Sequence, residues 1–304
     1  MTYITTHTSS HRRLAIALVL GLLYLITLIV ASLSSNSLTI AANAGHMLIH
    51  NGMLIIAFIA ATIAKKEPTN KFTAGYYKAD LIGSYTNGIL LLFVGILLGY
   101  EAFEVEPMHA HGNAPKTMGT VAIIGLILHS ISAWILHKGK DESLNVYAAF
   151  LHIGFDVLAT LLMLATAVII HFTAWHELDT FVGVFITIFI LISAVRLLAK
   201  ATKGLVDVTP THLDTAEINT ALKSIPHVID VHNTIIRNRG HKTIELSSHL
   251  VLESGCIHSG HWLDCRKEAE TMLKEKFGVQ YIVLQMEVAE DHSAHCDHPS
   301  HTGA

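Results

Sequence analysis

Six long apolar segments, separated by short polar stretches, occupy the first two thirds of the chain. They cover roughly residues 13–34, 38–64, 79–103, 117–137, 146–171 and 178–199, and each is close to the ~20 residues that a helix needs to cross a bilayer. The pattern predicts an α-helical membrane domain with six transmembrane helices, which we place at residues 1–205.

The pattern changes after residue 205, where charged and apolar residues alternate as they do in a soluble domain. The periodicity predicts helices at 214–224 and 260–276 and strands at about 228–237, 242–252 and 279–288. In the strands, positions 244, 246, 248, 250 and 279, 281, 283 alternate as in half-buried strands. We expect a small α+β domain over 206–290, with helices on one face of an antiparallel sheet. We interpret residues 291–304 as a His-rich flexible tail.

Lysine and arginine residues gather at one set of helix ends. An even number of spans puts both termini on the same side, and cytoplasmic loops carry the excess of positive charge. The residues on this side are Arg12, Arg13, Lys65, Lys66, Lys71, Lys78, Lys138, Lys140, Lys200 and Lys203, against Lys116 on the other. The chain is therefore expected to be a multi-pass integral membrane protein with cytoplasmic termini, in the inner or cell membrane if it is bacterial.

Composition supports this class. The mean hydropathy is +0.48, and only 14% of the residues are charged. The net charge of -4 and the lack of a basic stripe with interleaved aromatics argue against a nucleic-acid partner. Histidine stands out, with 22 residues against 3 cysteines, which directs attention to metal binding.

Two motifs place metal-capable groups inside apolar spans: His46-x3-His50 and His152-x3-Asp156. Residues i and i+4 share one face of a helix. A helix rises about 1.5 Å per residue, so depth can be counted along each span. His46 and His50 lie roughly 12 to 18 Å from the outer face, and His152 and Asp156 lie roughly 10 to 16 Å from the inner face. Ionisable groups at this depth mark ion or proton pathways. We expect the four side chains to converge on one cation.

Three imidazoles and a carboxylate suit a tetrahedral zinc ion. The empty site carries about one negative charge and the loaded site about one positive charge, so binding should be reversible. Protons compete for the same lone pairs, which favours metal–proton antiport, with zinc as substrate and protons as counter-ion. An enzyme would need a further oriented acid or base, and no other carboxylate lies at this depth.

Other polar residues in the spans have two interpretations. His129 is either a helix-to-helix hydrogen-bonding residue or an accessory ligand. Asn43, Asn51 and Asn87 either join helices or belong to the ion path. A non-transporting, metal-sensing membrane subunit is the alternative to a transporter.

The motifs resemble those of the cation diffusion facilitator family of zinc-type efflux transporters. The residues that carry the resemblance are the segment 41–50 (AANAGHMLIH), the segment 72–80 (FTAGYYKAD) with Asn87-Gly88, and the run from Asn145 to Asp156. The resemblance implies a homodimer of six-helix membrane domains, each with a ferredoxin-like, metallochaperone-like αββαβ cytoplasmic domain. It also implies a cytoplasmic metal site at His232, His249 and Glu287.

The chain departs from the family pattern at three positions. His50 and Asn43 stand where the family usually has aspartate, and His129 stands where it commonly has asparagine. A nitrogen-rich shell favours zinc, cobalt, nickel or copper over manganese. The expected function is efflux of a divalent cation, first of all zinc, by proton antiport; the same fold moving cobalt, nickel, iron or copper is an alternative.

Overall fold

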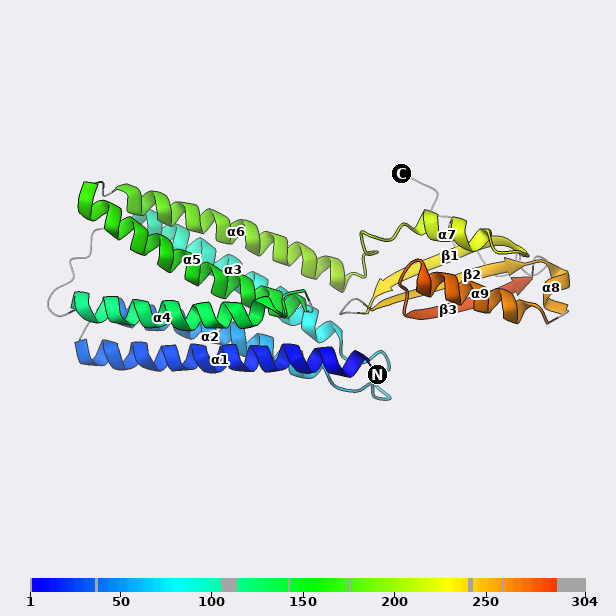
Figure 1. Ribbon diagram of the computed structural model, residues 1–304, viewed down its shortest axis with the longest axis horizontal. Helices are drawn as coiled ribbons and strands as arrows, with labels where there is room; N and C mark the ends of the chain where they lie inside the picture. The colour runs from blue at the N-terminus through cyan, green and yellow to red at the C-terminus, as the bar shows by residue number, and fades with distance from the viewer. Residues whose placement is uncertain are drawn as a thin grey trace. The chain divides into compact units, whose positions relative to one another are not determined.

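The computed structural model describes residues 2–35, 38–104, 114–141, 143–173, 175, 177–239, 243–258 and 260–288. The chain divides into two compact units, Met1–Leu205 and Val206–Ala304, both drawn in Figure 1. The His-rich tail expected at 291–304 lies outside the described residues.

The first unit is a bundle of long helices. They are α1 (Thr2–Ser35), α2 (Leu38–Ala64), α3 (Lys78–Glu104), α4 (Ala114–His137), α5 (Leu144–Thr173) and α6 (Glu177–Leu205). Among the described residues, six helices are long and apolar enough to cross a membrane, which confirms the six expected spans. The exposed faces carry large apolar side chains such as Val30, Leu33 and Phe181, as a surface in contact with lipid does.

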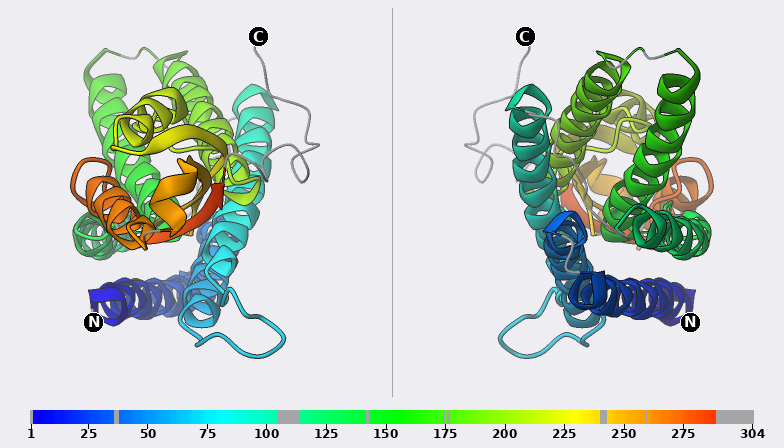
Figure 2. Two further views of the ribbon diagram at one scale, coloured as in Figure 1. Left: turned by 90° about the vertical axis from the view of Figure 1, so that its right-hand side faces the viewer. Right: turned by 90° about the vertical axis from the view of Figure 1, so that its left-hand side faces the viewer.

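The helices of the bundle close into a ring, seen end-on in the right-hand view of Figure 2. Neighbours pack in the order α1, α2, α3, α6, α5, α4 and back to α1. Helix α5 also packs against α2 and α3. The helices that carry the two predicted motifs, α2 and α5, are therefore in direct contact.

The second unit combines a three-stranded sheet with helices. Its elements are α7 (Thr215–Lys223), β1 (Val228–Asn238), β2 (Ile244–Leu252), α8 (Ser254–His258), α9 (Trp262–Glu275) and β3 (Tyr281–Val288). The sheet order is β1-β2-β3. The short helix α8 was not expected from the sequence.

The expectation of an antiparallel sheet is wrong for one strand pair. β1 and β2 are antiparallel, but β2 and β3 are parallel. The reason is the connection: α8 and α9 separate β2 from β3, and such a crossover returns the chain to the starting edge, so β3 runs in the direction of β2. The sheet is mixed.

One face of the sheet forms the core with α7 and α9. Ile218 and Leu222 of α7 and Leu273 of α9 pack against Leu246 and Leu250 of β2. In β3 the residues that pack on this core are Ile282, Leu284 and Met286, whereas Tyr281 and Val283 are exposed. The interpretation of 281 and 283 as the buried positions is therefore wrong. Because side chains alternate along a strand, His249 and Glu287 lie on the face away from the helices.

Candidate metal site in the membrane helices

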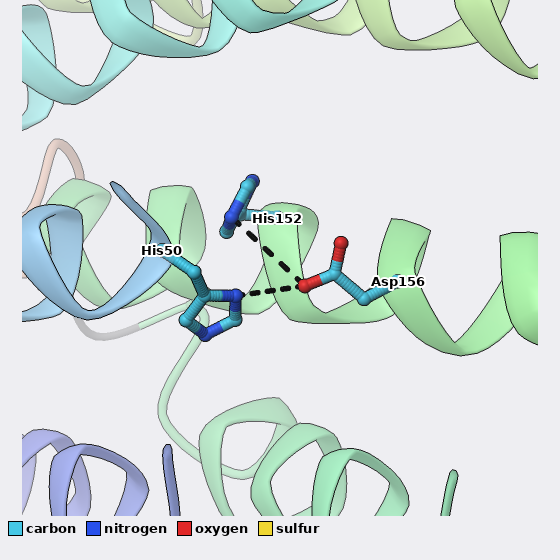
Figure 3. A group of neighbouring side chains, drawn as sticks. All are labelled: His50, His152 and Asp156. Atoms are coloured by element: carbon cyan, nitrogen blue, oxygen red, sulfur yellow. Dashed lines mark hydrogen bonds and ion pairs between the residues drawn. The ribbon is translucent and has the colours of Figure 1, made fainter. Parts of the chain in front are cut away.

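The carboxylate of Asp156 on α5 is the centre of a cluster of imidazoles. His50 Nδ1 on α2 lies 2.8 Å from Asp156 Oδ2, and His152 Nε2 lies 3.9 Å from the same oxygen. His46 Nε2 lies 3.8 Å from Asp156 Oδ1. Figure 3 shows His50 and His152 directed at the carboxylate from the two helices. All four residues of the two motifs thus meet at one carboxylate.

The helical spacing and the depth of the motifs explain this meeting. Each motif places its two side chains on one face, one turn apart. His50 and His152 are buried, with 1% and 6% of their surface exposed, whereas the side chain of His46 is 35% exposed. Two deeply buried imidazoles and one accessible imidazole therefore surround Asp156.

Two nitrogen atoms in the cluster lack hydrogen-bond partners among the described residues. They are His50 Nε2 and His152 Nε2. Buried polar atoms are nearly always paired, and an unpaired one calls for an explanation such as an ion or a water. His50, His152 and Asp156 also present ligand atoms within 4.8 Å of one another. The cluster is chemically suited to a cation.

The distances from the imidazoles to Asp156 can be compared with ligand separations around a tetrahedral metal. Zinc–ligand bonds of about 2.0 Å separate the ligand atoms by about 3.3 Å. The three distances to Asp156, at 2.8, 3.8 and 3.9 Å, lie on both sides of that value. The ligand atoms of His50, His152 and Asp156 lie within 4.8 Å of one another and His46 is outside that group, so a four-ligand shell would require the side chains to close around the ion.

A cavity of about 660 Å³ leads to the cluster. Its walls come from α1, the first parts of α2, α4 and α6, the later part of α3 and the middle of α5. Apart from the middle of α5, these helix parts lie toward the ends remote from the lysine-rich ends. The polar residues in these walls are Tyr24, Asn43, His46, His129, His152, Asp156 and Thr160. The cluster is therefore accessible from one end of the bundle.

The other end of the bundle is closed by packed apolar side chains. Leu14 of α1, Leu54 of α2, Leu136 of α4 and Ile153 of α5 belong to one buried cluster there, and none is more than 2% exposed. The two ends of the bundle thus differ in access to Asp156.

The sequence allowed two interpretations for three asparagines, and the structure places each of them differently. Asn51 joins α2 to α1, because its Nδ2 donates to the carbonyl of Gly21 at 3.2 Å. Asn43 lines the large cavity. Asn87 joins α3 to α2 through Met53 and also lines a second, small cavity.

His129 also lines the large cavity. Its ring centroid lies 5.3 Å from that of His50 and 5.2 Å from that of Tyr24. It is outside the group whose ligand atoms lie within 4.8 Å of one another.

The sequence reading missed two residues of the cavity wall. Thr160 follows His152 and Asp156 at the same interval of four residues, so the helical spacing could have placed it on the same face. Its hydroxyl donates to the Asp156 carbonyl at 2.7 Å. Tyr24 has no such spacing signal, because in the sequence it is only a hydroxyl-bearing side chain within an apolar span.

The second unit holds the other cluster of possible ligands, on the open face of the sheet. His249 Nδ1 lies 2.6 Å from Glu287 Oε1, and His232 Nε2 lies 3.4 Å from Glu287 Oε2. Register explains this, because His232 pairs with His249 across β1 and β2, while His249 pairs with Gln285 of β3 and Glu287 lies two residues further along the same face. Gln285 donates to Glu287 Oε1 at 2.9 Å. The three residues predicted from the resemblance come together.

A ring of membrane-spanning helices around a buried cluster of imidazoles and a carboxylate, reached by a cavity from one end, defines a class of protein: a multi-pass carrier of cations. Comparison with known proteins agrees. A model of the cation efflux transmembrane domain matches residues 14–206, and a model of the cytoplasmic domain of cation efflux proteins matches residues 210–289. The chain belongs to the cation efflux, or cation diffusion facilitator, family.

Named relatives cover nearly the whole chain. The zinc transporter ZitB of Escherichia coli is 30% identical, over 97% of this chain and 96% of its own. The metal cation efflux protein CzcD of Cupriavidus metallidurans is 31% identical, over 92% of this chain and 87% of its own. A cadmium, cobalt and zinc/H(+)-K(+) antiporter of Bacillus subtilis is 28% identical, over 87% of this chain and 85% of its own. The protein is a divalent metal cation efflux transporter, not an enzyme.

Proposed function

We propose that this protein exports zinc in exchange for protons and that His46, His50, His152 and Asp156 bind the transported ion. The observation that carries the proposal is the convergence of three imidazoles from α2 and α5 on the Asp156 carboxylate, where His46, His152 and Asp156 line a cavity. Zinc is the metal named for several relatives, and the donor set suits it.

The difference in access between the two ends supports transport by alternating access. The positive-inside rule assigns the lysine-rich ends and both termini to the cytoplasm. With that orientation, the large cavity opens to the outer side, and the apolar cluster of Leu14, Leu54, Leu136 and Ile153 closes the inner side. Zinc could then leave through the open cavity on the outer side, whereas its capture from the cytoplasm would require these apolar side chains to separate.

Proton exchange follows from the chemistry of the ligands. An imidazole lone pair binds either a metal or a proton, so a site emptied of zinc on the outer side can return with protons. Only one of the four ligands is a carboxylate, because His50 replaces the aspartate that the family usually carries. The number of protons exchanged therefore depends mainly on imidazoles.

We further propose that the protein acts as a homodimer and that its cytoplasmic unit senses the metal. His232, His249 and Glu287 form a compact donor set on the open face of the sheet, with both histidine rings beside the Glu287 carboxylate. A metal bound there would stabilise the assembled form by linkage.

The nitrogen-rich shell also favours a second substrate class, cobalt, nickel, iron or copper ions, over manganese. A relative named as a cadmium, cobalt and zinc antiporter supports tests with these ions. In competition experiments, excess cobalt or nickel should reduce zinc flux, whereas manganese should not.

The decisive test is metal-dependent flux in liposomes that contain the purified protein, with zinc and pH indicators inside. Asp156→Asn keeps the size of the side chain but removes its charge, so both zinc uptake and the coupled proton flux should fall to the level of protein-free vesicles. His137→Ala at the end of α4, where the ring contacts Lys140, should leave both signals intact.

Retained zinc flux in Asp156→Asn would overturn the proposed site. Zinc flux without a pH signal in the wild type would overturn antiport. Binding of zinc to the wild-type protein without any flux would favour the alternative of a non-transporting sensor.

A further inference from the structure

Asn87 has an unsatisfied oxygen that interhelical contact does not explain. It lies on α3 and is buried, with 5% of its surface exposed. Its Nδ2 donates to the Met53 carbonyl at 3.3 Å, but its Oδ1 has no partner among the described residues. An amide oxygen buried in this way at membrane depth is costly unless a donor reaches it.

A small cavity joins Asn87 to His152. Its volume is about 10 Å³, and both residues line it together with Met53, Leu54 and Leu91. That volume corresponds to about one water molecule. Most of the wall is apolar, so Asn87 and His152 are the side chains in it that can hydrogen-bond a water.

His152 needs a partner on its other ring nitrogen. Its Nε2 faces Asp156 and is the nitrogen placed to bind a cation. This Nε2 makes no hydrogen bond among the residues that the structure describes. Histidines that bind metals almost always donate their second N–H to a carboxylate, a carbonyl or a water, which fixes the tautomer and the ring orientation.

We propose that Asn87 is a positioning residue for His152 and acts through a single water in this cavity. The water accepts a hydrogen bond from Nδ1–H of His152 and donates one to Asn87 Oδ1. This arrangement keeps the Nε2 lone pair of His152 directed at Asp156 and at the bound cation. The inference rests on the proposed role of His152 as a ligand and adds a residue of a third helix, α3, to the site.

Asn51 provides a matched comparison. It is also a buried asparagine whose Oδ1 lacks a partner among the described residues, and its Nδ2 donates to the Gly21 carbonyl of α1 and to the Met47 carbonyl of its own helix. It lines neither of the two cavities beside the metal cluster. Substitution of Asn51 therefore measures the cost of losing an interhelical asparagine that does not line the small cavity.

The test is the dissociation constant for zinc, measured by chelator competition on the full-length protein in detergent. A His232→Ala/His249→Ala background removes the cytoplasmic donor set. Asn87→Leu should weaken zinc binding by about 10- to 100-fold, the usual cost of losing the outer partner of a metal-bound histidine. Asn87→Asp keeps an acceptor oxygen and should bind zinc at least as tightly as the parent. Asn51→Leu should lower Tm but leave zinc affinity unchanged.

A double-mutant cycle distinguishes positioning from general disturbance. In a His152→Ala background, Asn87→Leu should cause no further loss of zinc affinity, because the water has lost the group that it orients. An equal further loss there, or an Asn87→Asp variant as weak as Asn87→Leu, would refute the inference. So would a high-resolution structure in which the cavity holds no water, a result that does not depend on how the variants fold.

The two proposals fail separately. Unchanged zinc affinity in His152→Ala would refute His152 as a ligand and the proposed function with it. Unchanged affinity in Asn87→Leu, together with a loss in His152→Ala, would refute only the role of Asn87.

Discussion

A single carboxylate organises the membrane site, since Asp156 is the common neighbour of three imidazoles from two helices. The family usually has a second carboxylate at position 50. A histidine there keeps a metal-binding atom in place but removes a charge, so the loaded site should release its ion more readily. At this scale a change of residue type alters the charge of the site more than its geometry.

Two buried cysteines in the cytoplasmic unit give a prediction at the same scale. Cys256 and Cys265 are not joined by a disulfide, and their sulfur atoms lie 3.6 Å apart. Burial, together with the neighbouring Cys256 thiol, raises the pKa of Cys265 to about 11. A raised thiol pKa means that the reactive thiolate is scarce at any pH well below that value.

We therefore expect slow alkylation of Cys265 by iodoacetamide at pH 7.5 in the native protein, in a Cys296→Ser background without the third cysteine. Between pH 7.5 and 9.5 the rate should rise about tenfold for each pH unit, because the thiolate fraction does so below the pKa. Mass spectrometry of timed samples measures both rates. Fast labelling at pH 7.5, comparable with that of the denatured protein, would contradict the prediction.

At the scale of elements, the close packing of α2, α3 and α5 determines where the site lies. Gly83 of α3 lets the helices approach, because a Cβ at this position would overlap the Cβ of Ala60 on α2. Asn145 at the start of α5 is held nearby, since its Nδ2 donates to the Ala57 carbonyl at 2.6 Å. Small residues at helix contacts of this kind are typical of membrane proteins.

Gly83→Ala should force α2 and α3 apart. Overpacking of this kind costs about 1–3 kcal/mol, so we expect a lower Tm and weaker zinc binding through displacement of His50. Gly52→Ala is the matched control, because no neighbouring atom lies within 4 Å of a Cβ added there. Thermal unfolding in detergent measures the difference, and equal Tm values for the two variants would count against close packing at Gly83.

At the scale of the whole molecule, the chain holds two donor clusters in two compact units. The membrane cluster has the cavity that transport requires, whereas the cluster of His232, His249 and Glu287 lies on a sheet face. These locations fit the two roles proposed above, which are transport for the membrane cluster and sensing for the cluster on the sheet.

The double variant His249→Ala/Glu287→Ala should separate the two roles. Zinc flux in liposomes should persist, because the membrane cluster is untouched, but it should require a higher zinc concentration on the cytoplasmic side. Flux measured over a series of zinc concentrations tests this. Complete loss of flux in a folded variant would make the cytoplasmic cluster part of the transport path.

Much of the architecture could be predicted from the chain because bilayer-length apolar runs and i, i+4 spacing are local properties. The six predicted spans agree with the observed helices, and the depth counted along the helices placed His50 and Asp156 at a similar level in the membrane. The strand pattern failed at Tyr281 and Val283, because alternation gives the period but not the face. The parallel pairing of β3 was missed because it depends on how α9 crosses the sheet.

The sequence by itself determined which segments cross the membrane and which side chains share a helix face, since both follow from length, hydropathy and the helical repeat. Tertiary structure alone decided which faces meet. It set the 2.8 Å contact between His50 and Asp156, the open and closed ends of the bundle, and the small cavity between Asn87 and His152. These depend on packing between helices distant in sequence, where a displacement of one ångström changes which atoms touch.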